Sequence, residues 1–196
     1  MSKKLATARS ELILGGQKSG KSRRAEMLAL GWMAQSPAHH AVLIATAQAW
    51  DDEMRARIER HQQDRAIRVP GMRTIEEPLQ LAQALTLYSE PQTLVVVDCL
   101  TLWLTNLLMP AEYAEKKQPV VQDESAPTAM ILGAIKAASG PVVLVCNEIG
   151  LGVIPLGRDT RAFVDALGRL NQKVAQVCER VTFMAAGLPL TLKGRP

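Results

Sequence analysis

The sequence predicts an α/β fold in three layers, a largely parallel sheet with helices on both faces. Short apolar runs alternate with longer segments of helical periodicity along the chain. The runs are continuously apolar, which is typical of strands buried on both faces of a parallel sheet. A glycine-rich stretch directly follows the first run, where a strand is expected to pass into a helix.

That glycine-rich stretch, GGQKSGKS, lies between an expected strand at 12–14 and an expected helix at 22–34. It has the phosphate-loop spacing G-x-x-x-x-G-K-S, formed by Gly15, Gly20, Lys21 and Ser22. In such loops backbone N–H groups surround a triphosphate, the lysine reaches the β and γ oxygens, and the serine binds Mg²⁺. A flexible glycine turn is the alternative, but the flanking strand and helix favour the loop. The expected fold is therefore that of phosphate-loop NTPases, RecA-like in arrangement.

The length of the chain predicts one domain, and its charge suits the binding of small anionic molecules. The chain has 196 residues, with 23 Lys and Arg against 19 Asp and Glu, and this mild excess is too small to indicate nucleic-acid binding. Residues 1–10 are expected to form a loose tail and residues 11–196 a single domain. No apolar stretch reaches the length of a membrane span, and three widely separated cysteines predict buried thiols in a reducing cytoplasm.

A second buried strand is expected at 41–45, ending in Thr46, and a helix at 51–65 follows it. Met54, Ile58 and His61 share one face of that helix, and its polar face is rich in arginine. A solvated arginine face with a half-buried structural histidine is the common explanation of such a pattern. The alternative is a nucleophilic His61 whose neighbouring arginines hold the phosphates that it attacks.

The middle of the chain supplies several acids. Residues 67–77 are expected to be irregular, and Glu76 and Glu77 have a purely structural interpretation as acids near the start of a helix at 79–88. A strand at 93–97 ends in Asp98, the Walker B pattern in which a carboxylate holds Mg²⁺. The apolar helix expected at 99–109 is either core or subunit contact.

The last part of the chain continues the βα alternation. A polar surface loop is expected at 110–128, a helix at 129–138 and a strand at 142–146. Asn147 and Glu148 end that strand, before a loop with two glycines that is either a simple turn or a ligand-facing segment. A helix at 159–179, a strand at 181–186 and an alternating edge segment at 187–196 complete the prediction.

Several stretches together resemble the bifunctional adenosylcobinamide kinase/adenosylcobinamide-phosphate guanylyltransferase family of cobalamin biosynthesis. They are GGQKSGKS, IATAQAWDDEMRARIERHQQDR, TIEEP, VVVDCLTLWLTNLL, VCNEIGLGVIP and RAFVDALGRLNQKVAQVCERVTFMAAGLPLTLK. The resemblance extends from Glu11 to Lys193. Its most distinctive parts are DDEM-x-x-R-I-x-x-H and NE-x-G-x-G-x-x-P, which ordinary phosphate-loop kinases lack.

This resemblance implies two reactions on a corrinoid. The first phosphorylates the aminopropanol hydroxyl of adenosylcobinamide with a nucleoside triphosphate, ATP or GTP. The second transfers GMP from GTP to that phosphate, giving adenosylcobinamide-GDP and pyrophosphate through a guanylyl-histidine, which here would be His61. A neutral imidazole nitrogen can attack the α-phosphorus and leave a reactive phosphoramidate.

The resemblance also implies which residues form the site. Lys21 would serve the phosphates, Ser22 and Asp98 the Mg²⁺, Glu76 the guanine or ribose, and Asn147, Glu148 and Arg161 the corrinoid arm. The full implied nucleotide site is Gly15, Gly16, Gln17, Lys18, Ser19, Gly20, Lys21, Ser22, Ala45, Thr46, Ala47, Gln62, Gln63, Asp64, Arg65, Glu76 and Asp98. Family members form homo-oligomers, typically trimers, in which a neighbouring subunit helps to complete the site.

Two other functions stay open from the residues alone. The chain could be a generic phosphate-loop small-molecule kinase in which His61 is only a surface residue. It could also be a non-catalytic assembly protein that binds GTP without covalent chemistry. Covalent guanylylation separates the first function from both alternatives.

Overall fold

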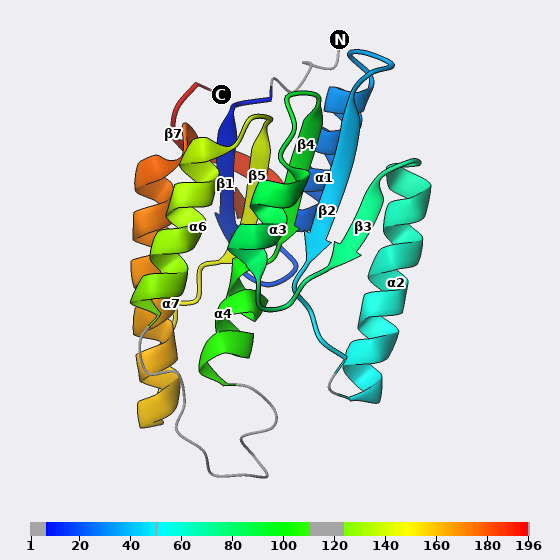
Figure 1. The fold of residues 1–196 in the computed structure, drawn as a ribbon. Helices are drawn as coiled ribbons and strands as arrows, with labels where there is room; N and C mark the ends of the chain where they lie inside the picture. Colours follow the sequence, from blue (N-terminus) through cyan, green and yellow to red (C-terminus); the bar gives the residue numbers. More distant parts are fainter. Residues whose placement is uncertain (1–6, 50, 110–123, 196) are drawn as a thin grey trace.

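The computed structural model describes residues 7–49, 51–109 and 124–195, which form a seven-stranded sheet between layers of helices (Figure 1). The strand order is β3-β2-β4-β5-β1-β6-β7, and every pairing is parallel except that of β6 with β7. The predicted α/β fold with a largely parallel sheet is confirmed.

The strands are short, and the interior strands β2, β4 and β5 carry continuous apolar runs. The bounds of the strands are β1 Ser10–Gly15, β2 His40–Ala45, β3 Arg73–Glu76, β4 Thr93–Asp98, β5 Val142–Asn147, β6 Arg180–Ala185 and β7 Leu188–Lys193. Burial on both faces explains why β2, β4 and β5 lack the alternating pattern of a half-exposed sheet.

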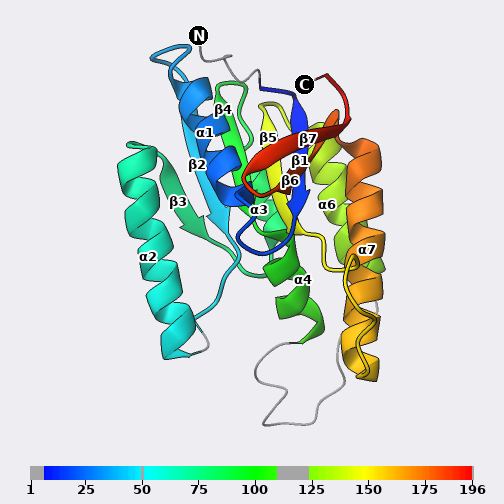
Figure 2. The ribbon, with the colours of Figure 1, turned by 180° about the vertical axis from the view of Figure 1, so that it is seen from behind.

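The helices divide between the two faces of the sheet (Figures 1 and 2). On one face α3, α4, α6 and α7 share a core with β4 and β5, in which Trp103 and Leu104 are fully buried. On the other face α1 packs through Ala25, Leu28 and Ala29. The bounds are α1 Lys21–Met33, α2 Asp52–Arg68, α3 Leu81–Tyr88, α4 Leu100–Leu108, α6 Ser125–Ala137 and α7 Arg158–Val177.

Because these strands run parallel, their carboxyl ends lie together along one side of the sheet, called here the carboxyl edge. Gly15 of β1 pairs with Asn147 of β5, and Ala45 of β2 pairs with Asp98 of β4. Loops that follow these strands therefore meet at this edge, which is where ligands bind in open α/β sheets.

Two predicted boundaries were wrong. Residues 67–77 are not irregular, because α2 continues to Arg68 and Arg73–Glu76 forms the edge strand β3. Of the loop predicted at 110–128, residues 110–123 lie outside the described residues, but α6 begins at Ser125 and includes Pro127. Proline is compatible with a first helical turn, whose N–H groups have no partner inside the helix.

Segments near both ends of the chain take part in the sheet. Ser10 opens β1, and the Arg9 N–H donates to Glu179 Oε2 at 2.8 Å, whereas residues 1–6 of the expected tail lie outside the described residues. The alternating edge segment predicted near the C-terminus is confirmed as β7, whose Leu188, Leu190 and Leu192 are exposed.

All three cysteines are free, as expected for thiols far apart in the chain. Cys146 and Cys178 are buried, and burial raises the pKa of Cys178 to about 12 and that of Cys99 to about 11. These thiols are therefore protonated at neutral pH. Within the described ranges, the helices are all too short or too polar to cross a membrane.

Candidate functional site

The phosphate loop leaves β1 at Gly15 and enters α1 at Lys21, as its spacing predicts. Gly15 has a φ of 152°, and a Cβ there would lie 2.5 Å from the backbone oxygen of Met184 in β6. Gly20 has a φ of 100°, and its Cβ would approach the Cα of Gly187 to 3.3 Å. Glycine is therefore required at both positions by backbone conformation and by the close approach of the β6–β7 segment.

Lys21 is buried at the first turn of α1, and its ammonium donates to the carbonyl of Gly16 at 2.6 Å. The lysine thus folds back over the loop rather than out to solvent. Burial lowers the pKa of Lys21 from its ordinary value, and the negative charge of Asp98 opposes that change. A phosphate anion in the loop would favour the charged lysine in the same way.

The ends of β2 and β4 are locked together beside the loop. The Thr46 hydroxyl is fully buried, donates to the Cys99 carbonyl at 2.7 Å and accepts the Cys99 N–H at 2.9 Å. The Thr46 N–H donates to the Asp98 carbonyl at 3.2 Å. Thr46 therefore fixes the backbone that presents the half-buried Asp98 carboxylate at the strand ends.

Ser22 and Asp98 are suited to hold a Mg²⁺ ion with the phosphates of a bound nucleotide. Ser22 is the second residue of α1, and Asp98 ends the strand next to β5. Across the described parts of the chain, no group of three His, Cys, Asp or Glu side chains is placed to form a metal site. One carboxylate and one hydroxyl suit Mg²⁺, which keeps several waters and binds substrate phosphates directly.

The end of β5 is joined to the phosphate loop and to α7. The Glu148 N–H donates to the Gly15 carbonyl at 3.1 Å, so the residue lies directly beside the start of the loop. Asn171 of α7 is 4% exposed and donates from Nδ2 to the Asn147 carbonyl at 3.1 Å and to Glu148 Oε2 at 3.3 Å. Asn147 and Glu148 therefore belong to the same edge as the phosphate loop.

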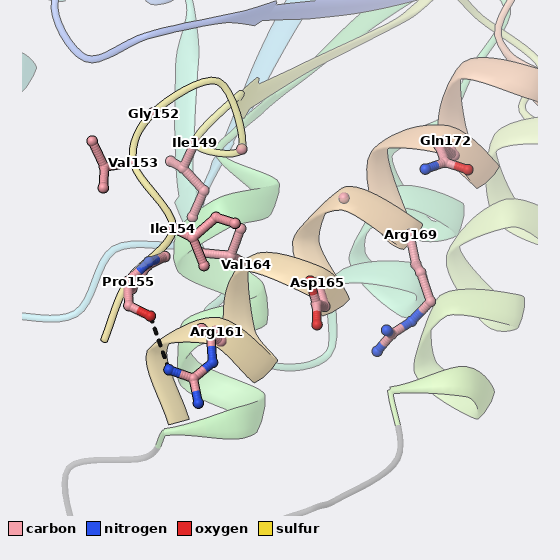
Figure 3. Close-up of a pocket in the computed structure, with 12 residues that line it drawn as sticks. Ile149, Gly152, Val153, Ile154, Pro155, Arg161, Val164, Asp165, Arg169 and Gln172 are labelled. Atoms are coloured by element: carbon pink, nitrogen blue, oxygen red, sulfur yellow. Dashed lines mark hydrogen bonds between the residues drawn. The ribbon is translucent and has the colours of Figure 1, made fainter. Parts of the chain in front are cut away.

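A pocket of about 560 Å³ opens beyond Glu148, between the 149–155 loop and α7 (Figure 3). Its loop side is apolar, with Ile149, Val153 and Ile154 exposed, and its helix side presents Arg161, Asp165 and Arg169. Arg161 donates to the carbonyls of Pro155 and Leu156, which ties the end of the loop to the first turns of α7. The pocket thus combines apolar surface with charge, as a large amphipathic ligand requires.

The second group of expected nucleotide-binding residues lies on α2, beside β3 at the far edge of the sheet (Figure 1). His61 is exposed, and its imidazole makes no hydrogen bond or ion pair with the described residues. It is therefore not the half-buried histidine that the helical pattern suggests. Next to it, Gln62 Nε2 donates to Glu76 Oε1 at 3.2 Å and links α2 to β3.

Glu26, which the sequence analysis did not single out, joins α2 to α1. Glu26 is 3% exposed, and its carboxylate lies 3.0 Å from Arg68 and 4.0 Å from the buried Arg65. Arg65 also donates to the Thr74 hydroxyl at 3.0 Å. Arg65 is therefore directed at α1 and β3 rather than at solvent. An acid among the apolar positions of α1 is the signal in the sequence that could have indicated this role.

We expect Glu26→Gln to lower the free energy of unfolding by about 3 kcal/mol, because it leaves the Arg65 guanidinium buried without a counter-charge. Urea unfolding followed by circular dichroism measures this change. Glu59→Gln is the matched control, since Glu59 is an exposed carboxylate on α2. Equal stability of the two variants would show that Glu26 does not hold α2 in place.

The structure thus brings together one part of the expected site and separates another. The phosphate loop, residues 45–47, Asp98, Asn147 and Glu148 lie at the carboxyl edge of the sheet, and Arg161 lies in the adjoining pocket. Glu76 ends β3 and pairs with Ala45 of β2, so it also lies at the carboxyl ends of the strands, and Gln62 of α2 is hydrogen-bonded to it. His61, Gln63, Asp64 and Arg65 lie on α2. The sequence analysis missed Glu26 and Asn171.

Comparison with known proteins identifies similar sequences along nearly the whole chain. Residues 11–192 match the family model "Cobinamide kinase / cobinamide phosphate guanyltransferase". A bifunctional adenosylcobalamin biosynthesis protein of Pseudomonas aeruginosa is 48% identical, covering 95% of this chain and 98% of the relative. A bifunctional adenosylcobalamin biosynthesis protein of Escherichia coli is 35% identical, covering 93% of this chain and 98% of the relative.

Among solved structures, the flagellar accessory protein FlaH of Methanocaldococcus jannaschii has a similar fold, with a TM-score of 0.53. The alignment covers 96% of this chain and 80% of that one, at 9% sequence identity. At this identity the similarity concerns the fold alone, and it is consistent with a RecA-like phosphate-loop architecture.

Proposed function

Because the chain belongs to the cobinamide kinase / cobinamide phosphate guanyltransferase family, we propose that its two activities share one nucleotide site at the phosphate loop. The enzyme phosphorylates adenosylcobinamide and transfers GMP from GTP to the product, giving adenosylcobinamide-GDP and pyrophosphate. The observation that supports a shared site is the convergence of the phosphate loop, Asp98 and the end of β5 at one edge of the sheet.

In the phosphorylation step, the phosphate loop binds ATP or GTP through its backbone N–H groups and the N-terminus of α1. Lys21 neutralises charge on the β and γ phosphates, and Ser22 and Asp98 would hold a Mg²⁺ ion, which would supply further positive charge to the phosphates. The corrinoid arm lies along Asn147, Glu148 and Arg161, in the pocket between the 149–155 loop and α7. This arrangement directs the acceptor hydroxyl at the terminal phosphate.

In the guanylyl transfer step, a ring nitrogen of His61 attacks the α-phosphorus of GTP and pyrophosphate leaves. The phosphate of adenosylcobinamide phosphate then displaces the histidine, so that each of the two steps is an in-line displacement. The exposure of His61 supports this role, since a nucleophile must reach a bound substrate. Gln62, Gln63, Asp64 and Glu76 belong to the guanine and ribose side of the same site, and the buried Arg65 supports them from behind through Thr74 and Glu26.

His61 lies on α2 and the phosphate loop follows β1, so a second copy of the chain could bring the two groups together. The proposed enzyme is therefore a homo-oligomer. In the sheet, the three strands β2, β4 and β5 lie between β1 and β3, which adjoins α2. In a homotrimer an adjacent copy completes the site by supplying His61 to the phosphate loop of its neighbour. An exposed His61 with no polar contact inside the described chain suits such an arrangement.

The test is covalent labelling by [α-³²P]GTP with Mg²⁺, followed by digestion and mass spectrometry of the labelled peptide. We expect one label, stable in alkali and lost in acid as a phosphoramidate is, on the peptide that contains His61. A control with [γ-³²P]GTP should leave no stable label. If the label maps to another residue, His61 is not the nucleophile, and if the wild type takes up no label, the covalent mechanism is wrong.

A further inference from the structure

Glu148 has an arrangement that the proposed function leaves unexplained. Its backbone N–H binds the carbonyl of Gly15 at 3.1 Å, which fixes the residue beside the phosphate loop. Its two carboxylate oxygens are bound separately, Oε1 by the Gly150 N–H at 3.2 Å and Oε2 by Asn171 Nδ2 at 3.3 Å. The carboxylate is therefore held in one orientation, between the phosphate loop and the pocket whose lining begins at Ile149.

Asn171 is the residue that imposes this orientation. It lies within the apolar face of α7, between Leu167, Leu170 and Val174, and is only 4% exposed. Its Nδ2 group binds Glu148 and the Asn147 carbonyl, while its Oδ1 atom is buried without a hydrogen-bond partner. A buried amide oxygen without a partner is costly, so this asparagine is poorly explained by packing alone.

Among the described residues, no charged side chain binds the Glu148 carboxylate directly. The buried Cys146 thiol of β5 lies close enough to interact electrostatically with both Glu148 and Lys21, and Lys21 also interacts with Asp98 of β4. None of the Glu148 contacts is an ion pair, because Gly150 and Asn171 are neutral donors. The carboxylate keeps acceptor capacity for an incoming hydroxyl.

We infer that Glu148 is the general base of the phosphorylation step and that Asn171 positions it. The acceptor hydroxyl gives its proton to the Glu148 carboxylate as its oxygen bonds to the γ-phosphorus. The bond from that phosphorus to the β,γ-bridging oxygen breaks, and the nucleoside diphosphate leaves with the electron pair. This inference rests on the proposed function, because it requires the acceptor to lie in the pocket beside β5.

The guanylyl transfer step does not need this base. Its acceptor is a phosphate oxygen that is already deprotonated at neutral pH, and its first half-reaction uses an imidazole instead of a hydroxyl. The two reactions of one enzyme should therefore differ in their dependence on Glu148. A residue that only supports the fold would affect both.

We expect Glu148→Gln to lower kcat of adenosylcobinamide phosphorylation by about 10² to 10⁴, with KM little changed. Labelling by [α-³²P]GTP, which involves no corrinoid, should stay near the wild-type level. Glu148→Asp, which keeps a carboxylate, should recover part of the lost kcat. Glu90→Gln is the matched control, since Glu90 is an exposed carboxylate near the opposite edge of the sheet.

Asn171→Asp tests the positioning role through pH. A second carboxylate beside Glu148 raises the pKa of the pair, so the acid limb of the kcat–pH profile for phosphorylation should move to higher pH. An unmoved acid limb with a lower kcat would indicate that Asn171 is merely structural.

The assays distinguish the role of Glu148 from the two activities of the enzyme. If Glu148→Gln phosphorylates adenosylcobinamide at the wild-type rate while His61 is labelled normally, Glu148 is not the base and the proposed function stands. Equal loss of both reactions in a folded Glu148→Gln, with no recovery in Glu148→Asp, would also overturn the inference. If the wild type neither phosphorylates the corrinoid nor takes up label, the proposed function itself is wrong.

Discussion

His61→Asn is expected to abolish guanylyl transfer while leaving adenosylcobinamide phosphorylation near its wild-type rate. The proposed covalent intermediate needs a nucleophilic ring nitrogen, and asparagine offers only an amide of similar size. The kinase step uses the phosphate loop and the β5 edge, which are separate from α2 in the structure. Two assays on one preparation, phosphorylation of adenosylcobinamide and labelling by [α-³²P]GTP, measure the two effects.

His40→Asn is the matched control for this variant. His40 is an exposed histidine at the first residue of β2, so it lies at the amino ends of the strands, away from the phosphate loop. We expect His40→Asn to retain both activities. Label that persists in His61→Asn would exclude His61 as the nucleophile. Loss of phosphorylation as well would show that His61 also serves the kinase step.

Lys21→Met should lower the rates of both reactions, each by a factor on the order of 10³. Methionine fills similar space but lacks the ammonium that neutralises the phosphates. The effect extends to both steps because each uses a triphosphate held by the same loop. Initial rates with saturating corrinoid measure it, and Lys136→Met, an exposed lysine of α6, is the control. A reaction that is insensitive to Lys21→Met would have its nucleotide bound elsewhere.

Mixing the two inactive variants tests how the site is completed. If an adjacent copy supplies His61 to a phosphate loop, co-refolded His61→Asn and Lys21→Met should regain part of the guanylyl transfer activity, because some sites combine two intact parts. If the same chain supplies both groups, the mixture should stay inactive. Recovery or loss of activity can be interpreted because His61→Asn changes α2 and Lys21→Met changes the phosphate loop.

The central strands were predictable because their burial imposes a simple pattern. β2, β4 and β5 are continuous apolar runs, and the glycine loop marks the end of β1. β3 was missed because an edge strand is partly exposed, and its sequence Arg-Thr-Ile-Glu contains no apolar run. The start of α6 was missed because Pro127 resembles a helix breaker unless its place in the first turn is known.

The candidate site was predictable only where a motif fixes it. The phosphate loop and Asp98 follow from local patterns, and the parallel topology brings them to one edge. The contacts of Glu26 and Asn171 depend on pairings distant in sequence, with Arg68 of α2 and with the end of β5. Both are polar residues that interrupt an apolar helix face, which indicates a buried partner without identifying it.

The close fit between the phosphate loop and the β6–β7 segment has a consequence for how the protein is made. The Gly187 N–H donates to the Ser19 carbonyl at 3.0 Å, and Met184 closes against Gly15, so the loop takes its shape against residues near the C-terminus. β1 itself lies between β5 and β6, and Ser10 pairs with Val142. During translation β1 therefore cannot pair until β5 and β6 have been synthesised. The phosphate loop can take its binding conformation only after the β6–β7 hairpin has left the ribosome.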